Sequence, residues 1–245
     1  MILAICTISA TGFAQLTRRE VNPGAAAQAL GTGWPHEVLT ATSTSCGRDP
    51  GPNEVLVYKD SDFRGSCAAL VPGFYPHAES LLVGNDAISS IKVGSGVRAR
   101  VFKDQVYGGD YNLYSSGSRN GGLGGSWNDV ISSMRVEPAG RSELCADVME
   151  GEFAVYRDSN KRGDCVVLPA SGQYENADAM GIANDSISSV WNNSSHTFDG
   201  WPDGNFKGAF VVQAKPHTTL MNLPTLHGGT GDFDQNDAIS SINFQ

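Results

Sequence analysis

The sequence of 245 residues contains no cluster of basic residues and no segment with a sustained helical period. Its 17 Lys and Arg residues are outnumbered by 26 Asp and Glu residues, and the formal net charge is −9. Binding to nucleic acid depends on basic clusters that displace counterions from phosphates, so this composition argues against it. An acidic surface suits the binding of cations, although it serves solubility equally well.

Motifs of the common catalytic sites are also absent from the sequence. The five His residues show no His-Glu-x-x-His spacing, and no Gly-x-Ser-x-Gly elbow, P-loop or dinucleotide fingerprint occurs. The five Cys residues include no Cys-x-x-Cys pair, which disfavours a zinc site. We therefore predict no catalytic residues and a protein that is not an enzyme.

What the chain does contain is one motif, Asn-Asp-x-Ile-Ser-Ser, written four times. An aromatic-x4-aromatic-x-Gly motif precedes each copy, except that Lys161 replaces the second aromatic residue in the third unit. A fourfold repeat predicts a fold built from four copies of one unit. The Asn-Asp motifs begin at Asn85, Asn128, Asn184 and Asn236, and the aromatic motifs begin at Tyr58, Phe102, Tyr156 and Trp201.

The fourth unit is longer than the others. The first aromatic residue lies 27, 26, 28 and 35 residues before its Asn in the four units, so the fourth has an insertion of roughly eight residues. The insertion falls between Pro216 and Gln235, and we interpret it as a loop. In the third unit, Lys161 is expected either near the Asn-Asp loops or in solvent, with its stem packed on Tyr156.

Within each unit the apolar residues alternate as in short strands around the Gly of a turn, which predicts an all-β protein. The Gly supplies a positive φ where the hairpin folds over, and the first aromatic ring covers the bend. The last Ser of each Asn-Asp motif is expected to hydrogen-bond the open backbone of that bend. The predicted segments are a signal peptide at 1–14, a flexible extension at 15–51, a first domain at 52–137, a linker at 138–151 and a second domain at 152–245.

The N-terminal segment predicts secretion. Residues 2–14 are uncharged and mostly apolar, and they end in Gly12-Phe13-Ala14, whose small residues suit cleavage of a signal peptide. A buried N-terminal strand is the alternative interpretation. The stretch is too short to span a bilayer, so no transmembrane segment is predicted.

The cysteine positions support secretion independently. After removal of the signal peptide four Cys residues remain, and the repeat symmetry selects one of three possible pairings. Cys46 pairs with Cys67 and Cys145 with Cys165, because the two pairs occupy equivalent positions in the first and third units. Disulfides of this kind are typical of extracellular proteins.

Together the two motifs resemble those of the βγ-crystallin superfamily, specifically its microbial calcium-binding type. The resemblance covers roughly residues 53 to 244. It implies two double Greek-key β-sandwich domains, each with up to two Ca²⁺ ions. Since Ca²⁺ takes about 6 to 8 oxygen ligands, one six-residue loop cannot fill its shell, and two loops must share each ion.

The resemblance also implies which residues bind the metal. Each site takes the carbonyl of the third motif residue and the side chain of the fifth from one loop, with the Asp carboxylate from the partner loop. The implied ligands are Asp86, Ala87, Ser89, Asp129, Val130 and Ser132 in the first domain, and Asp185, Ser186, Ser188, Asp237, Ala238 and Ser240 in the second. Loop-shaping bonds from side chain to backbone are expected from Asn85, Asn128, Asn184 and Asn236. Further carbonyls are expected from the bends near Asp60, Asp104, Asp158 and Asp203.

The sequence thus predicts a secreted, non-enzymatic structural or stress-type protein whose fold Ca²⁺ stabilises. One alternative is a protease inhibitor or antimicrobial toxin that uses an exposed loop such as Lys215 to Gln235. Another is a module that binds carbohydrate or a cell surface through Trp127, Trp191 or Trp201, residues that otherwise pack in the sandwich. An extracellular protein or glycan partner is not identified by the sequence.

Overall fold

The computed structural model describes residues 37–209, 212–223, 225–228, 231–234 and 238–245. All of them belong to one compact unit. Most elements are antiparallel strands, and the α-helices are single turns, α2 (Ala78–Leu81) and α3 (Ala177–Met180). Within the described ranges, no helix has the length and apolar character needed to cross a membrane. The predicted signal peptide at 1–14 and residues 15–36 of the predicted extension lie outside the described residues.

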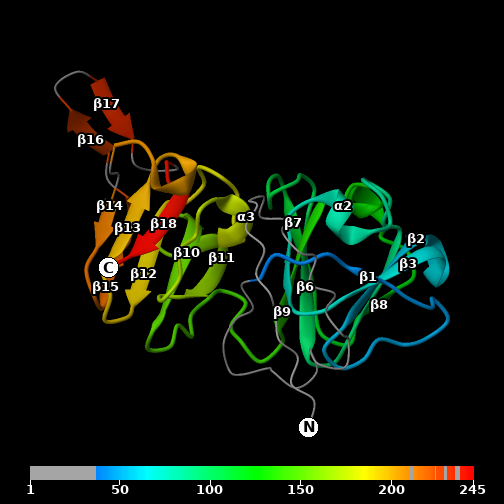
Figure 1. The fold of residues 1–245 in the computed structure, drawn as a ribbon. Helices are drawn as coiled ribbons and strands as arrows, with labels where there is room; N and C mark the ends of the chain where they lie inside the picture. Colours follow the sequence, from blue (N-terminus) through cyan, green and yellow to red (C-terminus); the bar gives the residue numbers. More distant parts are fainter. Residues whose placement is uncertain (1–36, 210–211, 224, 229–230, 235–237) are drawn as a thin grey trace, which may run out of the picture. The chain divides into compact units, whose positions relative to one another are not determined.

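Strands β1 to β9 form two sheets, here called the N-terminal sandwich (Figure 1). Each sheet contains one strand from the neighbouring unit: β4 joins the sheet of β6, and β8 joins the sheet of β2. This exchange interlocks two Greek keys. In sheet order the strands are β1 (Thr42–Ser43), β3 (Arg64–Leu70), β2 (Val55–Asp60), β5 (Ser90–Val93) and β8 (Arg119–Asn120), then β4 (Gly73–Tyr75), β9 (Ser133–Pro138), β6 (Val97–Phe102) and β7 (Tyr111–Tyr114).

The C-terminal sandwich repeats this arrangement with β10 to β15 and β18. Strand β15 pairs with β12 as β8 pairs with β5, while the counterpart of β4 is reduced to one bridge between Tyr174 and Ile242. The predicted all-β fold of two double Greek-key sandwiches is confirmed, and the domain boundaries within it stay predictions. In sheet order the strands are β11 (Arg162–Pro169), β10 (Glu152–Asp158), β12 (Ser189–Asn193) and β15 (Thr218–Leu220), then β14 (Val212–Ala214), β13 (Phe198–Trp201) and β18 (Ser241–Phe244).

The aromatic and glycine motif folds each hairpin over, as the sequence predicted. Gly65 has a φ of 72°, and a Cβ built on it would lie 2.6 Å from Oδ2 of Asp60, so only glycine fits there. In the same bend, the rings of Tyr58 and Phe63 meet edge to face at 5.5 Å between centroids. Gly109, Gly163 and Gly208 also have positive φ. The bends of the first and fourth units each contain a 3₁₀ turn, η1 (Ser61–Phe63) and η3 (Gly204–Phe206), and a third such turn, η2 (Gly125–Trp127), lies directly before the Asn-Asp motif of the second unit.

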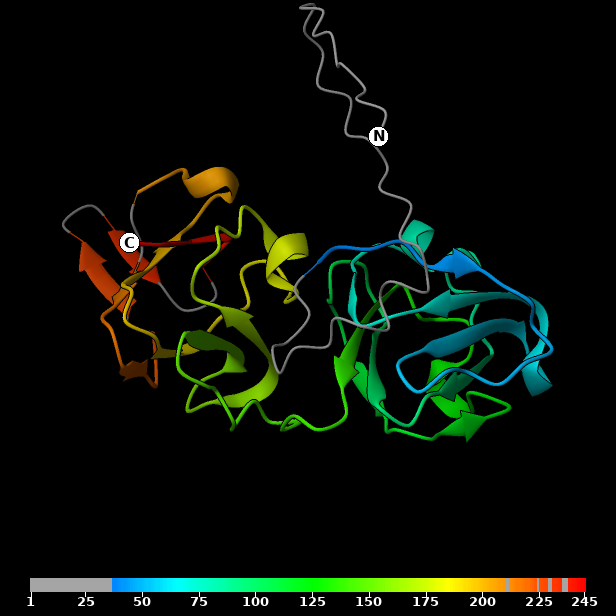
Figure 2. The same ribbon diagram turned by 60° about the horizontal axis from the view of Figure 1, so that its bottom comes forward.

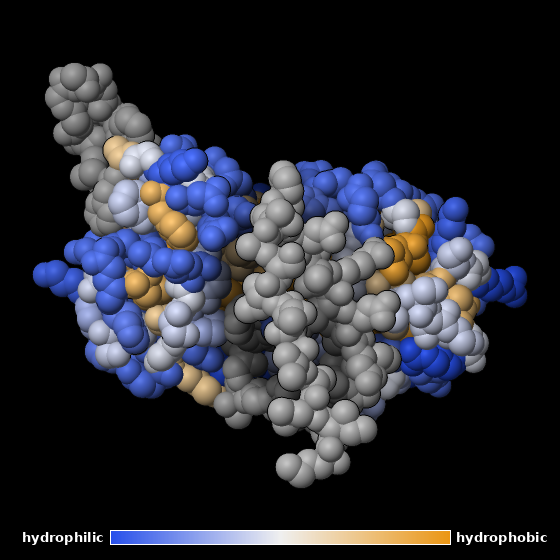
Figure 3. All heavy atoms as spheres, in the orientation of Figure 1, coloured by the Kyte–Doolittle hydropathy of each residue, from blue (hydrophilic) through white to orange (hydrophobic). Residues whose placement is uncertain are grey.

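Each sandwich buries apolar side chains between its sheets. The Ile of each Asn-Asp motif is fully buried in these cores. The core of the C-terminal sandwich also includes Phe74, Phe102 and Tyr107, which belong to the N-terminal sandwich. The two sandwiches therefore share an apolar contact. Hydrophilic residues cover most of the face in Figure 3, as the net charge of −9 leads one to expect.

The described part of the predicted flexible extension is an ordered segment. Strand β1 pairs with β3 at the edge of the first sheet, and Val38 bridges to Phe74. Ala41 is buried against the N-terminal core. Two paired residues give no readable alternation, so this edge strand could not be recognised from the sequence pattern. The extension as predicted at 15–51 therefore includes residues that belong to the sandwich.

The insertion of the fourth unit also differs from the loop that the sequence suggested. Strands β16 (Thr225–Gly228) and β17 (Gly231–Asp234) pair as a hairpin in this insertion. The hairpin forms a sheet of its own, outside the two sheets of the C-terminal sandwich (Figures 1 and 2). Each strand has only four residues, and a composition rich in Gly and Thr is also typical of a loop, so the sequence did not indicate this hairpin.

Both predicted disulfides are confirmed. Cys46 bonds to Cys67 with a Cα separation of 5.6 Å, and Cys145 bonds to Cys165 with one of 6.2 Å. The first bridge fastens the segment between β1 and β2 to β3, and the second fastens the segment before β10 to β11. The equivalent positions in the repeat thus identified the pairing correctly.

Candidate metal centre

The Asn-Asp motifs lie in loops that lead into the last strand of each unit. A fully buried Ile anchors each loop in the core. Two positions earlier, Asp86, Asp129 and Asp185 have φ values of 48°, 53° and 49°, so the backbone turns sharply at each Asp. The Asp side chains are exposed, while the Ser that follows Ile is buried. The loop therefore offers a carboxylate at its tip and a hydroxyl at its base.

In the N-terminal sandwich the two loops meet reciprocally. The hydroxyl of Ser89 donates to Oδ1 of Asp129 at 2.7 Å, and the hydroxyl of Ser132 donates to Oδ1 of Asp86 at 2.9 Å. Each pair joins the Ser of one loop to the Asp of the other. The structure therefore brings together the side-chain oxygens that the sequence assigned to two shared sites.

The C-terminal sandwich shows one of the two corresponding pairs. The hydroxyl of Ser240 donates to Oδ1 of Asp185 at 2.8 Å. Asp237, predicted for the other pair, and Asn236, predicted to shape its loop, lie outside the described residues. Ser188 donates to the carbonyl of Arg157 at 2.7 Å. Ser188 therefore lies next to a backbone carbonyl oxygen, which is a further candidate ligand beside its hydroxyl.

The leading Asn of each described loop contacts the adjacent carboxylate. Nδ2 of Asn85 donates to Oδ2 of Asp86 at 2.7 Å, and Asn128 and Asn184 do the same to the Asp that follows them. The sequence predicted a bond to the backbone instead. Because Oδ2 is bound by the Asn, Oδ1 is the oxygen directed at the partner loop. This Asn therefore orients the carboxylate.

The third residue of each motif was predicted to bind the metal through its backbone carbonyl. Ala87 and Val130 are half-buried between an exposed Asp and a buried Ile, and Ala238 is half-buried before the buried Ile239. Ser186 is buried, and its hydroxyl donates to the carbonyl of Ala183 at 2.6 Å. That these four residues supply carbonyl ligands stays a prediction.

The last Ser of each motif binds the bend of its own unit, as predicted. The hydroxyl of Ser90 donates to the carbonyl of Asp60 at 2.7 Å and accepts the N–H of Phe63 at 3.1 Å. The same pair of bonds occurs in the other three units, from Ser133 to Asp104 and Tyr107, from Ser189 to Asp158 and Lys161, and from Ser241 to Asp203 and Phe206. The last Ser is therefore part of the fold, whereas the Ser before it belongs to the candidate site.

These bonds involve the same bends from which carbonyl ligands were expected, and that the bends supply such ligands stays a prediction. The carbonyls of Asp60, Asp104, Asp158 and Asp203 accept the last Ser of each motif. The carbonyl one residue earlier, that of Arg157, instead faces Ser188. The sequence reasoning missed Arg157. The equivalent position before the bend Asp in every unit is the signal that could have identified it.

Lys161 is partly exposed and makes a contact that the sequence did not predict. Its Nζ lies 4.3 Å from the centroid of the Trp191 ring, a cation–π contact. Trp191 in turn packs against the cluster around the Cys145–Cys165 bridge, and Trp127 packs partly buried against the N-terminal core. Trp127 and Trp191 therefore pack in the sandwiches, which was the alternative to a role in carbohydrate binding.

The donor set suits a hard cation. Each pair of loops gathers carboxylate and hydroxyl oxygens, with a backbone carbonyl at Ser188, and Ca²⁺ prefers such ligands. In the described part of the chain, no three His, Cys, Asp or Glu side chains gather as a metal site. A metal held here would bind one carboxylate and several neutral oxygens. Sulfur- or imidazole-binding metals do not fit this set.

The protein is an all-β repeat protein built from paired Greek keys. Its acidic loops lie at equivalent positions, and each sandwich contains a candidate cation site. No family model matches the chain. The chain is 32% identical over 141 residues to Development-specific protein S of Myxococcus xanthus, covering 56% of this chain and 74% of that protein. It is 33% identical over 89 residues to Spherulin-3A of Physarum polycephalum, covering 36% of this chain and 85% of that protein.

The similarity extends to solved structures. A βγ-crystallin domain from Flavobacterium johnsoniae is 37% identical, with a TM-score of 0.33, and the match covers 36% of this chain and 98% of that one. Its identity to Development-specific protein S and to Spherulin-3A places the chain in the βγ-crystallin superfamily. The resemblance stated from the motifs is confirmed.

Proposed function

We propose that the protein binds Ca²⁺ between its paired Asn-Asp loops and that the metal stabilises the fold. The observation that carries this proposal is the reciprocal pairing of Ser89 with Asp129 and of Ser132 with Asp86. Each pairing joins two loops that are about 40 residues apart in sequence, so a cation bound there would crosslink them. Up to two ions per sandwich would be bound in this way.

The side chains suggest sites of modest affinity. Each site contains one carboxylate, and calcium affinity falls as the number of charged ligands falls. Extracellular modules commonly bind Ca²⁺ with dissociation constants of about 10⁻⁴ to 10⁻³ M. A site at ten times its dissociation constant adds about 1.4 kcal/mol to the free energy of unfolding, and several sites add together.

The proposed role is structural and extracellular. The two disulfides suit an oxidising compartment, and free calcium is abundant outside cells. The comparisons indicate no enzyme family. We therefore assign the chain a non-enzymatic function in which calcium keeps a secreted protein folded. The inhibitor and carbohydrate alternatives have no specific observation in their favour.

Isothermal titration with CaCl₂ tests the binding. The variants Ser89→Arg and Ser188→Arg place a cation at one site in each sandwich, while Ser115→Arg puts the same charge on an exposed turn as a control. The wild type and the control should release the same heat. Each loop variant should lose heat from its own sandwich only. Absence of heat from the wild type would refute the proposal.

A calorimetric scan tests the stabilisation separately. The melting temperature should be higher in millimolar calcium than in chelator, by several degrees for a gain of a few kcal/mol. Measured against its own melting temperature in chelator, the Ser89→Arg variant should show a smaller rise with calcium than the wild type. If the melting temperature were the same in calcium and in chelator, calcium would not stabilise the fold.

A further inference from the structure

Two buried arginines lie on the outer face of strand β6. Arg98 and Arg100 point away from the N-terminal core, because that core contains the alternate residues Val97, Ala99 and Val101. The outer face of a sandwich normally meets water. Here, however, Arg98 is 2% and Arg100 3% exposed. The segment before the C-terminal sandwich covers them.

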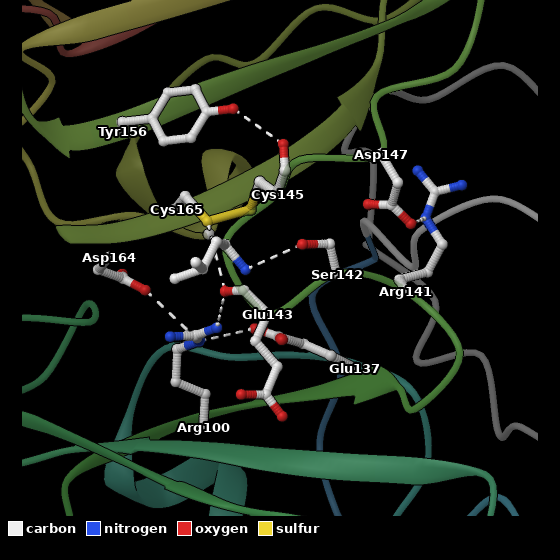
Figure 4. The surroundings of a disulfide bond; sticks show 12 residues. Arg100, Glu137, Arg141, Ser142, Glu143, Cys145, Asp147, Tyr156, Asp164 and Cys165 are labelled. Atoms are coloured by element: carbon white, nitrogen blue, oxygen red, sulfur yellow. Dashed lines mark hydrogen bonds and ion pairs between the residues drawn. A yellow bond between two sulfur atoms is a disulfide. The ribbon is translucent and has the colours of Figure 1, made fainter. Parts of the chain in front are cut away.

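The covering segment supplies backbone acceptors to both arginines. Nη1 of Arg98 donates to the carbonyl of Arg141 at 2.6 Å, and its Nη2 donates to the carbonyl of Ser142 at 3.0 Å. Nη2 of Arg100 donates to the carbonyl of Glu143 at 3.0 Å (Figure 4). Three consecutive carbonyls thus receive the guanidinium groups. Buried arginines are tolerable only when their donors are satisfied in this way.

A carboxylate of the N-terminal sandwich completes this side of the contact. Oε2 of Glu137 accepts Nε of Arg98 at 2.8 Å, and Oε1 accepts Nε of Arg100 at 3.1 Å. Burial by itself raises the pKa of Glu137, but the charges of Arg100, Arg135 and Arg98 outweigh it and lower that pKa. Glu137 is therefore ionised and holds the arginines side by side.

The third arginine reaches a second segment of the C-terminal sandwich. Arg135 donates from Nη2 to the carboxylate of Asp164 and from Nη1 to the carbonyl of Gly181 at 2.7 Å. Arg135 and Asp164 are both almost completely buried. We call Arg98, Arg100, Arg135, Glu137 and Asp164 the docking cluster. Its partners outside the N-terminal sandwich come from three segments, the carbonyls of residues 141–143, Asp164 and Gly181, of which the first two are about 20 residues apart.

The Cys145–Cys165 bridge joins these two segments covalently. Cys145 lies two residues after Glu143, and Cys165 is the neighbour of Asp164 (Figure 4). Both sulfur-bearing residues are buried, and the hydroxyl of Tyr156 holds the carbonyl of Cys145 at 2.9 Å. The bridge therefore sets the spacing between the carbonyls that receive Arg98 and Arg100 and the carboxylate that receives Arg135.

The equivalent bridge of the first unit has a different setting. Cys46–Cys67 fastens β1 and its neighbours to β3, within the N-terminal sandwich. The ion pair between Arg48 and Glu54 lies beside it in the same sandwich. The two bridges thus share a repeat position while their surroundings differ. This difference supplies a matched control.

We propose that the Cys145–Cys165 bridge acts as a clamp that couples the two sandwiches through the docking cluster. While the bridge is intact, its two segments present their acceptors to the three arginines at a fixed spacing. Without it, the segment at 141–145 can move away from Asp164 and leave buried guanidinium donors without acceptors. The N-terminal sandwich then loses its cover on β6 and β9, although neither strand contains a cysteine of the bridge.

Hydrogen exchange on the full chain tests the clamp. The variant Cys145→Ser/Cys165→Ser is compared with Cys46→Ser/Cys67→Ser, both in chelator so that calcium does not contribute. The first variant should speed exchange at least tenfold in β6 and β9, across the contact from the missing bridge. The second should speed exchange in β1 and β3 and leave β9 unchanged. Equal protection of β6 and β9 in the first variant and the wild type would overturn the clamp.

A second variant decides the question if the double serine variant fails to fold. Arg100→Met in the oxidised chain removes the bond to Glu143 without disturbing either bridge. It should speed exchange in residues 141–145 of the other sandwich, and Arg119→Met, on an exposed part of β8, should not. If Arg100→Met leaves residues 141–145 as protected as in the wild type, the proposed coupling is wrong.

Discussion

The two adjacent serines of each Asn-Asp loop bind different partners. Ser89 reaches the carboxylate of the other loop, whereas Ser90 holds the bend of its own unit through Asp60 and Phe63. A hydroxyl that binds two backbone groups in this way cannot also turn toward a metal. At the scale of the residue, the motif therefore separates binding from folding between neighbours in sequence.

Replacing these serines one at a time should separate the two roles. Ser90→Ala leaves the carbonyl of Asp60 and the N–H of Phe63 unsatisfied, which should cost about 1 to 3 kcal/mol in the free energy of unfolding in chelator. Ser89→Ala should change that free energy less, yet weaken calcium binding. Urea unfolding in chelator and calcium titration measure the two effects. Equal losses of stability would contradict this division.

The Asn before each Asp provides a second residue-scale prediction. In Asn128→Ala the carboxylate of Asp129 loses the donor at Oδ2, so it becomes free to rotate away from Ser89. Calcium affinity should fall roughly tenfold, equivalent to about 1.4 kcal/mol, for the loss of one bond to a charged group. The melting temperature in chelator should change little because Asn128 is exposed. A calorimetric titration that gives the wild-type affinity would rule out an orienting role.

The first and third units both contain a cation–π pair at the same two repeat positions. In the first unit, Nζ of Lys92 lies 4.8 Å from the centroid of the Phe63 ring. In the third unit the two residue types are exchanged, because Lys161 stands at the position of Phe63 and Trp191 at the position of Lys92. Trp191→Lys would set two ammonium groups against each other and cost about 1 to 2 kcal/mol. Adding Lys161→Phe should recover most of that loss. Urea unfolding of both variants measures the coupling, and additive losses would disprove the exchange.

At the scale of the element, the two short helices meet through a titrating side chain. His77 precedes α2, and its ring nitrogens lie 2.9 Å from Oδ2 of Asp178 in α3 and 3.1 Å from Oε1 of Gln105. Both partners are acceptors, so the doubly protonated ring fits best. Burial lowers the pKa of His77, but the bonds to Asp178 and Gln105 and the charges of Asp178 and Glu79 together raise it.

This contact should stabilise the protein in mild acid. Because the pKa is raised in the folded state, the contribution of His77 is complete below the unfolded value of about 6.5 and disappears as the pH rises through the folded pKa. The gain is at most about 1 kcal/mol, since the pair is partly exposed. His77→Gln should lower the melting temperature more at pH 5.5 than at pH 8.5. An equal effect at both pH values would exclude this titration.

The elements also show why the sequence predicted some features and missed others. The bends, the disulfides and the final Ser of each motif repeat at fixed spacing and depend on contacts within one unit. In contrast, Arg98, Arg100 and Glu137 alternate with apolar residues as solvent-facing side chains do. Their burial depends on the other sandwich. Strand β1, with two residues, and the hairpin β16–β17 likewise exist through pairing that no local pattern encodes.

At the scale of the whole molecule, the contact between the sandwiches combines the docking cluster with an apolar part. Phe74, Phe102 and Tyr107 join the core of the C-terminal sandwich, and Gly181 at the end of α3 lies against the ring of Phe74. Because backbone meets an aromatic ring so closely, the position has no space for a side chain. Disturbing this contact and measuring the free energy of unfolding therefore shows how much the two sandwiches stabilise each other.

A pair of glycine substitutions isolates that contribution. Gly181 has a φ of 70° and Gly151 a φ of 82°, so Ala at either position costs about 1 to 2 kcal/mol in backbone strain. A Cβ at Gly181 would lie 2.5 Å from Cζ of Phe74, whereas one at Gly151 meets no atom within 4 Å. Gly181→Ala should therefore cost about 1 to 3 kcal/mol more than Gly151→Ala, because it also overpacks the contact. Urea unfolding measures the difference, and Phe74→Leu should reduce it by making space for the added methyl group. Equal losses for the two glycine variants would mean that the sandwiches separate at this contact without affecting the stability of either.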